Sequence, residues 1–256
     1  MSVEAIQSRL LGISGLLPVE LSRSRTGADA YIQRVWDQWW RERDSFSDCI
    51  LPREVWRLHG LRPANHPQRR LALAAQWSVR SQFLQKIEEW CALSIPNPAL
   101  PETLLSVLET PSDEFWCRHF TLRSGQLAKE RPLLGASRVS ELAVNVVLPW
   151  LWSRASEGKN EAVRKVIQAR YFAWPRSQDN SVLRLARNRL LGGIPPEALP
   201  GSAAQQGLIQ IVRDFCDQSN PICDKCRFPE LVKQEQAKTS FFVPGSTNQT
   251  EYSPDF

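Results

Sequence analysis

The chain has 256 residues, 42% of them hydrophobic, so it can bury a sizeable core and is not globally disordered. Its net charge of +5, from 32 basic and 27 acidic residues, is too small to require a nucleic-acid partner, although its arginine-rich excess permits one. The longest apolar stretch is interrupted by Asn145 and Pro149, and we expect no secretory signal, no membrane partner and a cytoplasmic location.

The first 46 residues predict two helices separated by a polar turn. Residues 6–13 form a short apolar helix, and we interpret the whole segment 1–27 as the remnant of a contact with an upstream region. Residues 28–46 have apolar positions at helical spacing, which indicates an amphipathic helix. The face that we expect to be buried comprises Tyr31, Val35 and Trp39.

The most regular helix is predicted to begin at Asn65-His66-Pro67. Asn65 or His66 would cap it, and Pro67 would occupy its first turn, where the missing N–H costs nothing. Apolar positions then continue at helical spacing to about Leu93. A later helix is expected to bend at Pro149. The further helices are predicted, in chain order, at 104–108, 137–156, 160–171, 181–191 and 203–216.

These patterns predict an all-α fold, mainly helical, with at most a minor β element. We divide the chain into three parts on this basis. Segment 1–27 is followed by a helical domain, 28–232, which ends in a cysteine cluster, and by a polar tail, 233–256, that we expect to be disordered.

The cysteine cluster consists of Cys216, Cys223 and Cys226 and predicts a metal knuckle. A C-x-x-C turn lets two thiolates face one ion, and the preceding helix delivers the third. Soft thiolates suit zinc or an iron–sulfur cluster, and a thiolate-rich site is structural more often than catalytic. The alternative is a set of free thiols without a metal.

Three cysteines need a fourth ligand from elsewhere in the fold. The string FWCRHF, residues 115–120, offers two candidates, and we take His119 as the ligand from that element. A histidine among aromatic residues can equally be a core residue. The complete set of candidates for the fourth ligand is Cys49, Cys91, Cys117, His59, His66 and His119.

Two arginine-rich segments are candidates for phosphate recognition. Residues 57–70 place Arg62, Arg69 and Arg70 around the start of a predicted helix, where backbone N–H groups also favour anions. In residues 183–190, Arg184 and Arg187 share one side of a helix and could touch a phosphate backbone. The alternative is that both segments are solvated basic surfaces.

No complete catalytic motif accompanies these segments. The carboxylates lack the pattern of a metal nuclease, and neither a phosphate-cradling glycine loop nor a nucleophile elbow is present. We therefore expect a module that is not catalytic alone.

Several strings, taken in order, resemble the C-terminal part of the bacterial family called domain of unknown function 2851. The strings are GISGLLP, WDQWWRERD, LHGLRPANHPQRRLA, FWCRHF, NVVLPWLW and QGLIQIVRDFC with the C-x-x-C that follows. The resemblance extends to about residue 232. It implies a partial family member, whose nuclease-like N-terminal region would be supplied by a protein partner.

The C-x6-C-x2-C spacing also resembles the first three ligands of the iron–sulfur loop of endonuclease III-type DNA glycosylases, although Val232 occupies the fourth ligand's position. We therefore interpret the chain as a metal-stabilised helical module that binds nucleic acid or a nuclease-like partner. Two alternatives stay open: part of an iron–sulfur enzyme that processes nucleic acid, and a structural protein-interaction domain with no nucleic-acid role.

Overall fold

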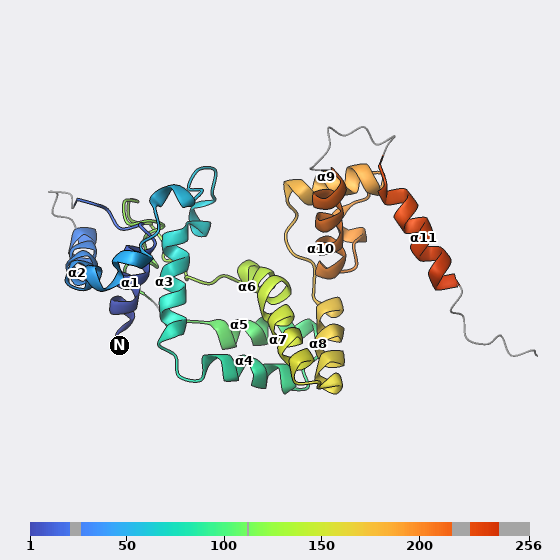
Figure 1. Cartoon of the computed structure of the whole chain (residues 1–256), viewed down its shortest axis with the longest axis horizontal. Helices are drawn as coiled ribbons and strands as arrows, with labels where there is room; N and C mark the ends of the chain where they lie inside the picture. The colour runs from blue at the N-terminus through green and yellow to red at the C-terminus, as the bar shows by residue number, and fades with distance from the viewer. Residues whose placement is uncertain (21–26, 112, 217–225, 241–256) are drawn as a thin grey trace, which may run out of the picture. The chain divides into compact units, whose positions relative to one another are not determined.

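A computed structural model describes residues 1–20, 27–111, 113–216 and 226–240, and within these ranges it contains helices and no strand (Figure 1). The chain divides into two compact units, Met1–Ser177 and Gln178–Phe256. The predicted all-α class is confirmed for the described residues. The unit boundary falls inside the segment that the sequence predicted as one domain.

The α-helices of the first unit, which is the larger of the two, are α1 (Val3–Ile13), α2 (Gly27–Glu42), α3 (Pro67–Ser78), α4 (Phe83–Ala92), α5 (Leu100–Leu108), α6 (Ala136–Leu142), α7 (Leu148–Glu157) and α8 (Glu161–Ala173). Its short 3-10 helices are η1 (Arg43–Cys49), η2 (Arg53–Val55), η3 (Pro63–Asn65) and η4 (Asn97–Ala99), and η5 (Ala143–Val147) is a π-helical turn. The second unit contains α9 (Ser181–Leu190), η6 (Pro196–Ala198), α10 (Ser202–Ile211), the π-helical turn η7 (Val212–Cys216) and α11 (Phe228–Ser240).

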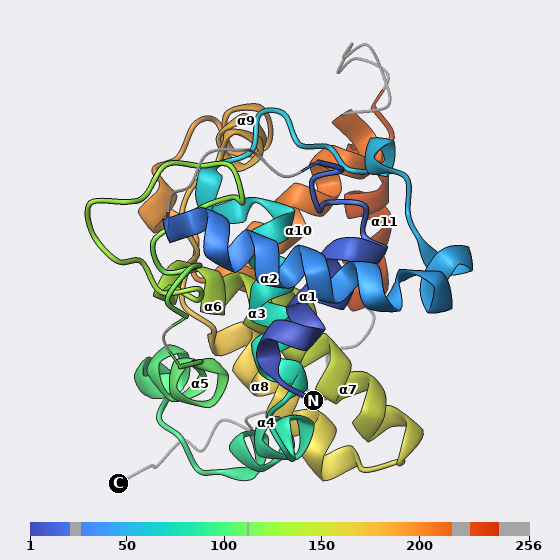
Figure 2. The same cartoon turned by 90° about the vertical axis from the view of Figure 1, so that its left-hand side faces the viewer.

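One core of the first unit forms where α1 lies between α2 and α3 (Figures 1 and 2). The predicted face of α2 is confirmed, because Tyr31, Val35 and Trp39 are all buried. Leu11 of α1 and Leu16 after it are fully buried in the same cluster. Within the segment 1–27, which we interpreted as a remnant, the described residues 1–20 thus contribute buried side chains to this core.

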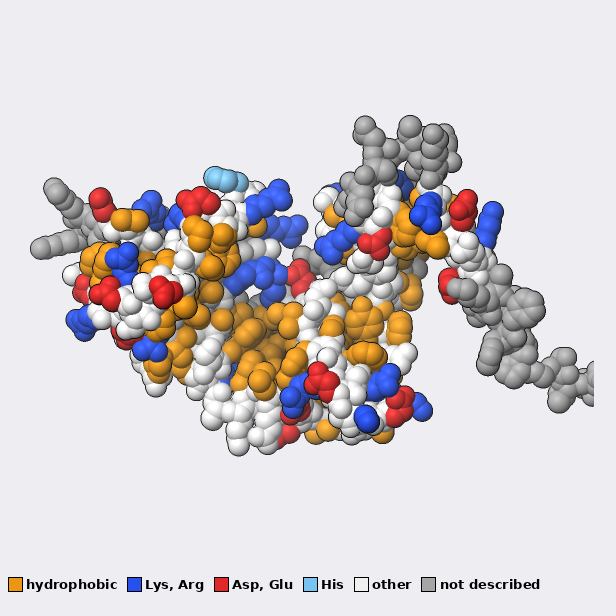
Figure 3. Space-filling model, in the orientation of Figure 1, with side chains coloured by type: hydrophobic (Ala, Val, Ile, Leu, Met, Phe, Trp, Pro, Cys, Tyr) orange, Lys and Arg blue, Asp and Glu red, His pale blue; other side chains and the backbone are white. Residues whose placement is uncertain are grey.

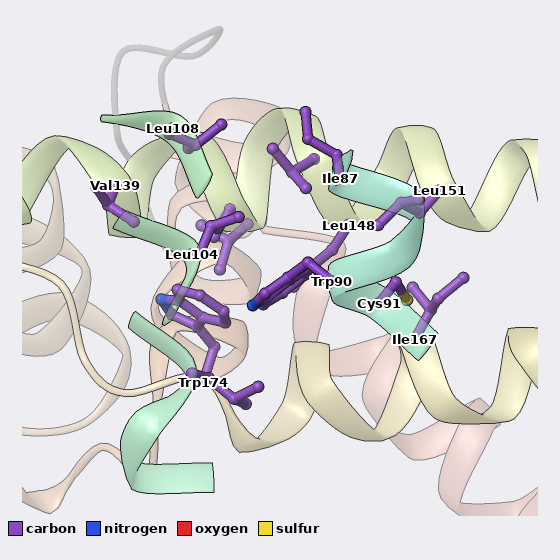
Figure 4. Packing of buried hydrophobic residues seen from close by; sticks show 14 of the residues in the cluster. Ile87, Trp90, Cys91, Leu104, Leu108, Val139, Leu148, Leu151, Ile167 and Trp174 are labelled. Atoms are coloured by element: carbon purple, nitrogen blue, oxygen red, sulfur yellow. The ribbon is translucent and has the colours of Figure 1, made fainter. Parts of the chain in front are cut away.

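The second core of the first unit joins α4 and α5 to the continuous run α6–η5–α7 and to α8 (Figure 4). Trp90 and Trp174 meet edge to face at its centre, with ring centroids 6.4 Å apart. Leu104, Leu148 and Ile167 are each less than 2% exposed around them. Burial of such large side chains supplies most of the stabilisation of a helical unit.

The helix predicted from Pro67 to about Leu93 is interrupted in the structure. It ends at Ser78, and a new helix begins at Phe83 after Gln82, whose φ of 57° is left-handed. Two contacts with the end of α5 explain the turn. The Trp77 Nε1–H donates to the Leu108 carbonyl over 2.8 Å, and Arg80 donates to the Glu109 carbonyl over 2.9 Å. The prediction of one continuous helix was therefore wrong.

The second unit has a small core between α9 and α10. Leu183, Ala186, Leu199, Leu208 and Val212 are its buried members. The α11 helix covers residues 228–240, so the first part of the tail that was expected to be disordered is helical; residues 241–256 lie outside the described ranges. Among the described residues of both units, no helix combines the length and apolarity needed to span a bilayer.

Candidate nucleic-acid interface

The candidate interface begins with a tight turn that follows Asp113. The Asp113 carboxylate accepts hydrogen bonds from the backbone N–H groups of Phe115 and Trp116, at 3.2 and 2.9 Å, and a further one from Gln7 at 2.9 Å. Trp116 is completely buried and donates to the Tyr31 hydroxyl. Burial, with the Asp113 carboxylate nearby, raises the pKa of the Tyr31 phenol. These contacts hold the turn rigidly against α1 and α2.

Arg69, the third residue of α3, fastens this turn to the helix. Its guanidinium donates to the carbonyls of Trp116 and His119, and to those of Arg131 and Pro132 at 2.6 and 2.8 Å. The side chain is only 3% exposed, and burial lowers its pKa. Arg69, predicted to contact phosphate, therefore has its donors engaged inside the protein.

Arg70 and Arg138 lie on the exposed side of the same junction. Arg70 donates through Nε to the Asn65 carbonyl at 3.1 Å, and Arg138 donates to the Asn65 side-chain oxygen. Partial burial and the Arg138 charge both lower the pKa of Arg70. Glu141 forms an ion pair with Arg138 and offsets part of that charge. A single asparagine thus holds two guanidinium groups close together.

Three exposed arginines lie in the same two segments as the exposed Arg70 and the half-buried Arg138. Arg62 leads into the η3 turn, whose Asn65 N–H donates to the Arg62 carbonyl at 2.7 Å. Burial, and then the Arg53 charge, lower the pKa of His66, and the Arg131 carbonyl accepts from Arg69 at 2.6 Å, so Arg53 and Arg131 lie near the start of α3. We call the set the basic surface: Arg53, Arg62, Arg70, Arg131 and Arg138.

The positive charge of the chain is concentrated in the two segments that build this surface. Residues 53–70 and 118–141 contain ten basic and three acidic side chains, a net charge of +7, whereas the whole chain carries +5. The segments pack together through Arg69 and through a hydrogen bond from the Leu122 N–H to the Gln68 side chain. Figure 3 shows Lys and Arg side chains gathered beside a histidine over the upper end of α3.

The sequence prediction found part of this surface and missed the rest. Arg62 and Arg70 are exposed, as an interface residue must be, but Arg53, Arg131 and Arg138 were not singled out. The high basic content of residues 118–141 was the available signal. The proximity of residues 118–141 to α3 depends on tertiary contacts, which local sequence patterns do not encode.

The second predicted segment lies in the other unit and is divided by burial. Arg184 is exposed on α9. Arg187 is 6% exposed, forms an ion pair with Asp179 at 2.7 Å and donates to the Ile194 carbonyl at 3.1 Å. Arg187 therefore ties α9 to its neighbouring loops rather than offering a free fork to a phosphate.

The predicted metal ligands are described only in part. Cys216 ends η7 and Cys226 precedes α11, both half-buried free thiols, while Cys223 lies outside the described residues. The rings of Phe215 and Phe228 lie 5.4 Å apart, so the residues next to Cys216 and Cys226 lie close together. No cluster of three potential metal ligands occurs among the residues that the structure places.

His119, the candidate fourth ligand, belongs to the first unit. Its ring is 7% exposed and stacks on Phe115 with centroids 4.2 Å apart. Its Nδ1 forms a hydrogen bond with the Phe115 carbonyl at 2.9 Å. These contacts make His119 a core residue of the Asp113 turn, which was the alternative that the sequence left open.

Comparison with known proteins gives one match. A family model described as a protein of unknown function (DUF2851) matches residues 1–179, which is the first unit plus two residues. The match ends before the cysteine cluster, whereas the sequence resemblance was expected to extend to about residue 232. No curated protein and no solved structure matches the chain.

Proposed function

The chain belongs to the protein family of unknown function DUF2851, and from this premise we propose that its first unit binds the phosphate backbone of nucleic acid through the basic surface. The observation that carries the proposal is the concentration of charge: a net +7 in two packed segments of a chain whose total is +5. Excess charge on one surface raises the local concentration of a polyanion and steers its approach.

The side-chain chemistry supports a phosphate ligand. Arg62 and Arg70 are exposed, and a guanidinium presents a planar fork that matches two phosphate oxygens. Asn65 holds Arg70 and Arg138 side by side, so their mutual repulsion is already present in the folded protein and an anion between them would relieve it. Such contacts position a nucleic acid without reading its sequence.

The test is the salt dependence of binding to a fluorescein-labelled DNA duplex, measured by fluorescence anisotropy. Each phosphate contact contributes about 0.9 to the slope of log K against log salt concentration. The double variant Arg62→Gln with Arg70→Gln should bind more weakly and give a slope shallower by roughly 1.8, if each arginine contacts one phosphate.

The matched control removes the same charge elsewhere in the first unit. Lys86 on α4 and Lys165 on α8 are both exposed, and α4 begins beyond the opposite end of α3 from the basic surface (Figure 1). Replacing both by glutamine should leave the slope unchanged. Equal loss in the two double variants would indicate a nonlocal charge effect, and no salt-dependent binding at all would favour a protein-interaction domain.

We also propose that Cys216, Cys223 and Cys226 hold a structural metal that stabilises the second unit. The contact between the rings of Phe215 and Phe228, which are tilted at 49° to one another, supports this, because it brings the residues next to Cys216 and Cys226 close together. The thiolate donor set fits zinc or an iron–sulfur cluster, and the fourth ligand stays unassigned. Metal loss should weaken the second unit and leave the basic surface of the first unchanged.

A further inference from the structure

A groove on the first unit, separate from the basic surface, lies along the antiparallel pair α7 and α8. It has a volume of about 510 Å³, within the usual range for small-molecule sites. Leu148 and Ile167 form its floor and belong to the core cluster beneath. The remaining lining residues are Pro149, Trp152, Arg164, Gln168 and Tyr171.

Arg164 is the one charged side chain that lines this groove. Its Nη1 forms an ion pair with Glu161 at 2.8 Å, one turn earlier on α8. Its Nε is buried and has no hydrogen-bond partner among the described residues. A buried N–H without a partner costs free energy, and the Arg164 side chain as a whole is 37% exposed, so a small rotation of the guanidinium would let an acceptor from outside the protein reach this atom.

The walls around Arg164 are suited to a flat apolar group. Trp152 is 43% exposed, and the Arg164 guanidinium carbon lies 5.0 Å from the centroid of its ring. Pro149 and Tyr171 add two more flat surfaces. Aromatic and proline walls favour planar ligands, while the guanidinium favours a carboxylate or a phosphate.

We propose that the α7–α8 groove binds a small planar molecule that carries a carboxylate or a phosphate. The planar part packs among Pro149, Trp152 and Tyr171, and the anionic group accepts hydrogen bonds from the Arg164 guanidinium. Glu161 competes for the same guanidinium, since it already occupies Nη1. The site therefore prefers anions, and Glu161 on the same helix lowers its affinity for them.

The test uses the full chain labelled with 5-fluorotryptophan and observed by fluorine NMR. The resonance of Trp152 is identified by its disappearance in the variant Trp152→Phe. The probes are 2-naphthoate, 2-naphthyl phosphate and the neutral naphthalene-2-methanol. We expect 2-naphthoate, 2-naphthyl phosphate or both to shift the Trp152 resonance. A shift caused by only one of them would identify the anionic group as a carboxylate or a phosphate. The neutral probe should bind about tenfold more weakly, because it lacks the charge-assisted hydrogen bond.

Two variants on α8 make the assignment specific. Arg164→Gln should weaken binding of the anion about tenfold and abolish the preference over the neutral probe. Lys165→Gln removes the same charge from the next residue, which is exposed and does not line the groove, and should bind as the native chain does. Glu161→Ala should tighten binding, because it removes the acceptor that occupies Nη1 of Arg164.

The proposal is overturned if neither anion shifts the Trp152 resonance at millimolar concentration. It is also overturned if Arg164→Gln and Lys165→Gln weaken binding equally, since the effect would then be one of net charge. Circular dichroism melting of each variant verifies folding. If Arg164→Gln does not fold, Arg164→Lys keeps the charge but lacks the Nε donor, and retention of native affinity in that variant would reject a role for Nε.

Discussion

Three buried arginines, Arg69, Arg170 and Arg187, use their guanidinium groups to hold loops against helices. Arg170, for example, is 6% exposed, donates to the carbonyls of Trp90 and Leu93 and lies over the Trp90 ring at 4.8 Å. A guanidinium has five N–H donors in a fixed fork, so one side chain can satisfy several carbonyls at once. Part of the arginine content of this chain is therefore structural.

The sequence could not separate these arginines from the exposed ones. Arg69 and Arg70 are adjacent in the chain, yet Arg69 is buried, with 3% of its surface exposed, and Arg70 lies on the surface of the protein. The carbonyls that accept from Arg69 lie 47 to 63 residues further along the chain. Helical periodicity predicts which side of a helix is apolar, but it does not predict which polar side chain a distant loop will cover.

His66 should make the stability of the first unit depend on pH. Its ring nitrogen Nδ1 accepts a hydrogen bond from the Gln68 N–H at 3.3 Å and so caps α3. Burial, and then the Arg53 charge, lower its pKa below the ordinary value of 6.5. The unfolded chain therefore takes up the proton first as pH falls, so stability is complete above about pH 6.5 and declines below it.

The variant His66→Asn keeps a capping oxygen but cannot be protonated. The midpoint of urea unfolding, followed by tryptophan fluorescence at pH 7.5 and 5.5, should fall less in this variant than in the native chain. His59 is exposed on the same loop, and His59→Asn is the matched control with native behaviour expected. An unaltered pH dependence in His66→Asn would show that His66 does not cause it.

At the scale of elements, the positions of most helices followed from apolar spacing, and their irregularities did not. The predicted helix at 137–156 is present as one run, but it contains the π-helical turn η5 directly before α7. Pro149 lacks a backbone N–H, so the regular hydrogen-bond pattern fails at that position and a wider turn accommodates the defect. A second π-helical turn, η7, ends at Cys216.

The contact between α1 and α2 depends on a glycine. A Cβ on Gly12 would overlap the indole of the buried Trp39. Replacing a helical glycine by alanine ordinarily stabilises a helix by about 0.5–1 kcal/mol. Gly12→Ala should instead destabilise the first unit by roughly 1–3 kcal/mol, because overpacking displaces the indole. Urea unfolding followed by tryptophan fluorescence measures the change.

Gly207 provides the control for that experiment. It is exposed on α10, and a Cβ there would have no neighbour within 4 Å. Gly207→Ala should stabilise the second unit by about 0.5–1 kcal/mol, as measured by circular dichroism. Gly12→Ala that stabilised the first unit to the same degree would mean that α1 and α2 can separate at little cost.

At the scale of the whole molecule, three boundaries coincide. The first compact unit ends at Ser177, the family match ends at residue 179, and the last of the ten tryptophans is Trp174. From the sequence, this boundary was only the gap between the predicted helices 160–171 and 181–191, and nothing distinguished that gap from the other loops. Separation into units depends on which helices share a core, and that information is distributed along the entire chain.

The distribution of tryptophan allows the two units to be observed separately. Fluorescence reports on the first unit alone, whereas far-ultraviolet circular dichroism reports on the helices of both. If Cys216, Cys223 and Cys226 bind a structural metal, a chelator or the variant Cys223→Ser should lower the melting temperature of the second unit by ~10 °C or more, because metal-binding free energy is folding free energy. The fluorescence transition should stay where it is in the native chain.

Elemental analysis of anaerobically purified protein identifies the metal in the same samples. About one zinc per chain would be consistent with a structural knuckle. Iron, with visible absorption typical of thiolate-ligated clusters, would instead favour an iron–sulfur protein that processes nucleic acid, and a cleavage assay would then follow. Absence of both metals, together with an unchanged dichroism transition in Cys223→Ser, would leave three free thiols and contradict the metal proposal. A chelator that lowered the fluorescence transition as well would mean that the two units do not unfold independently.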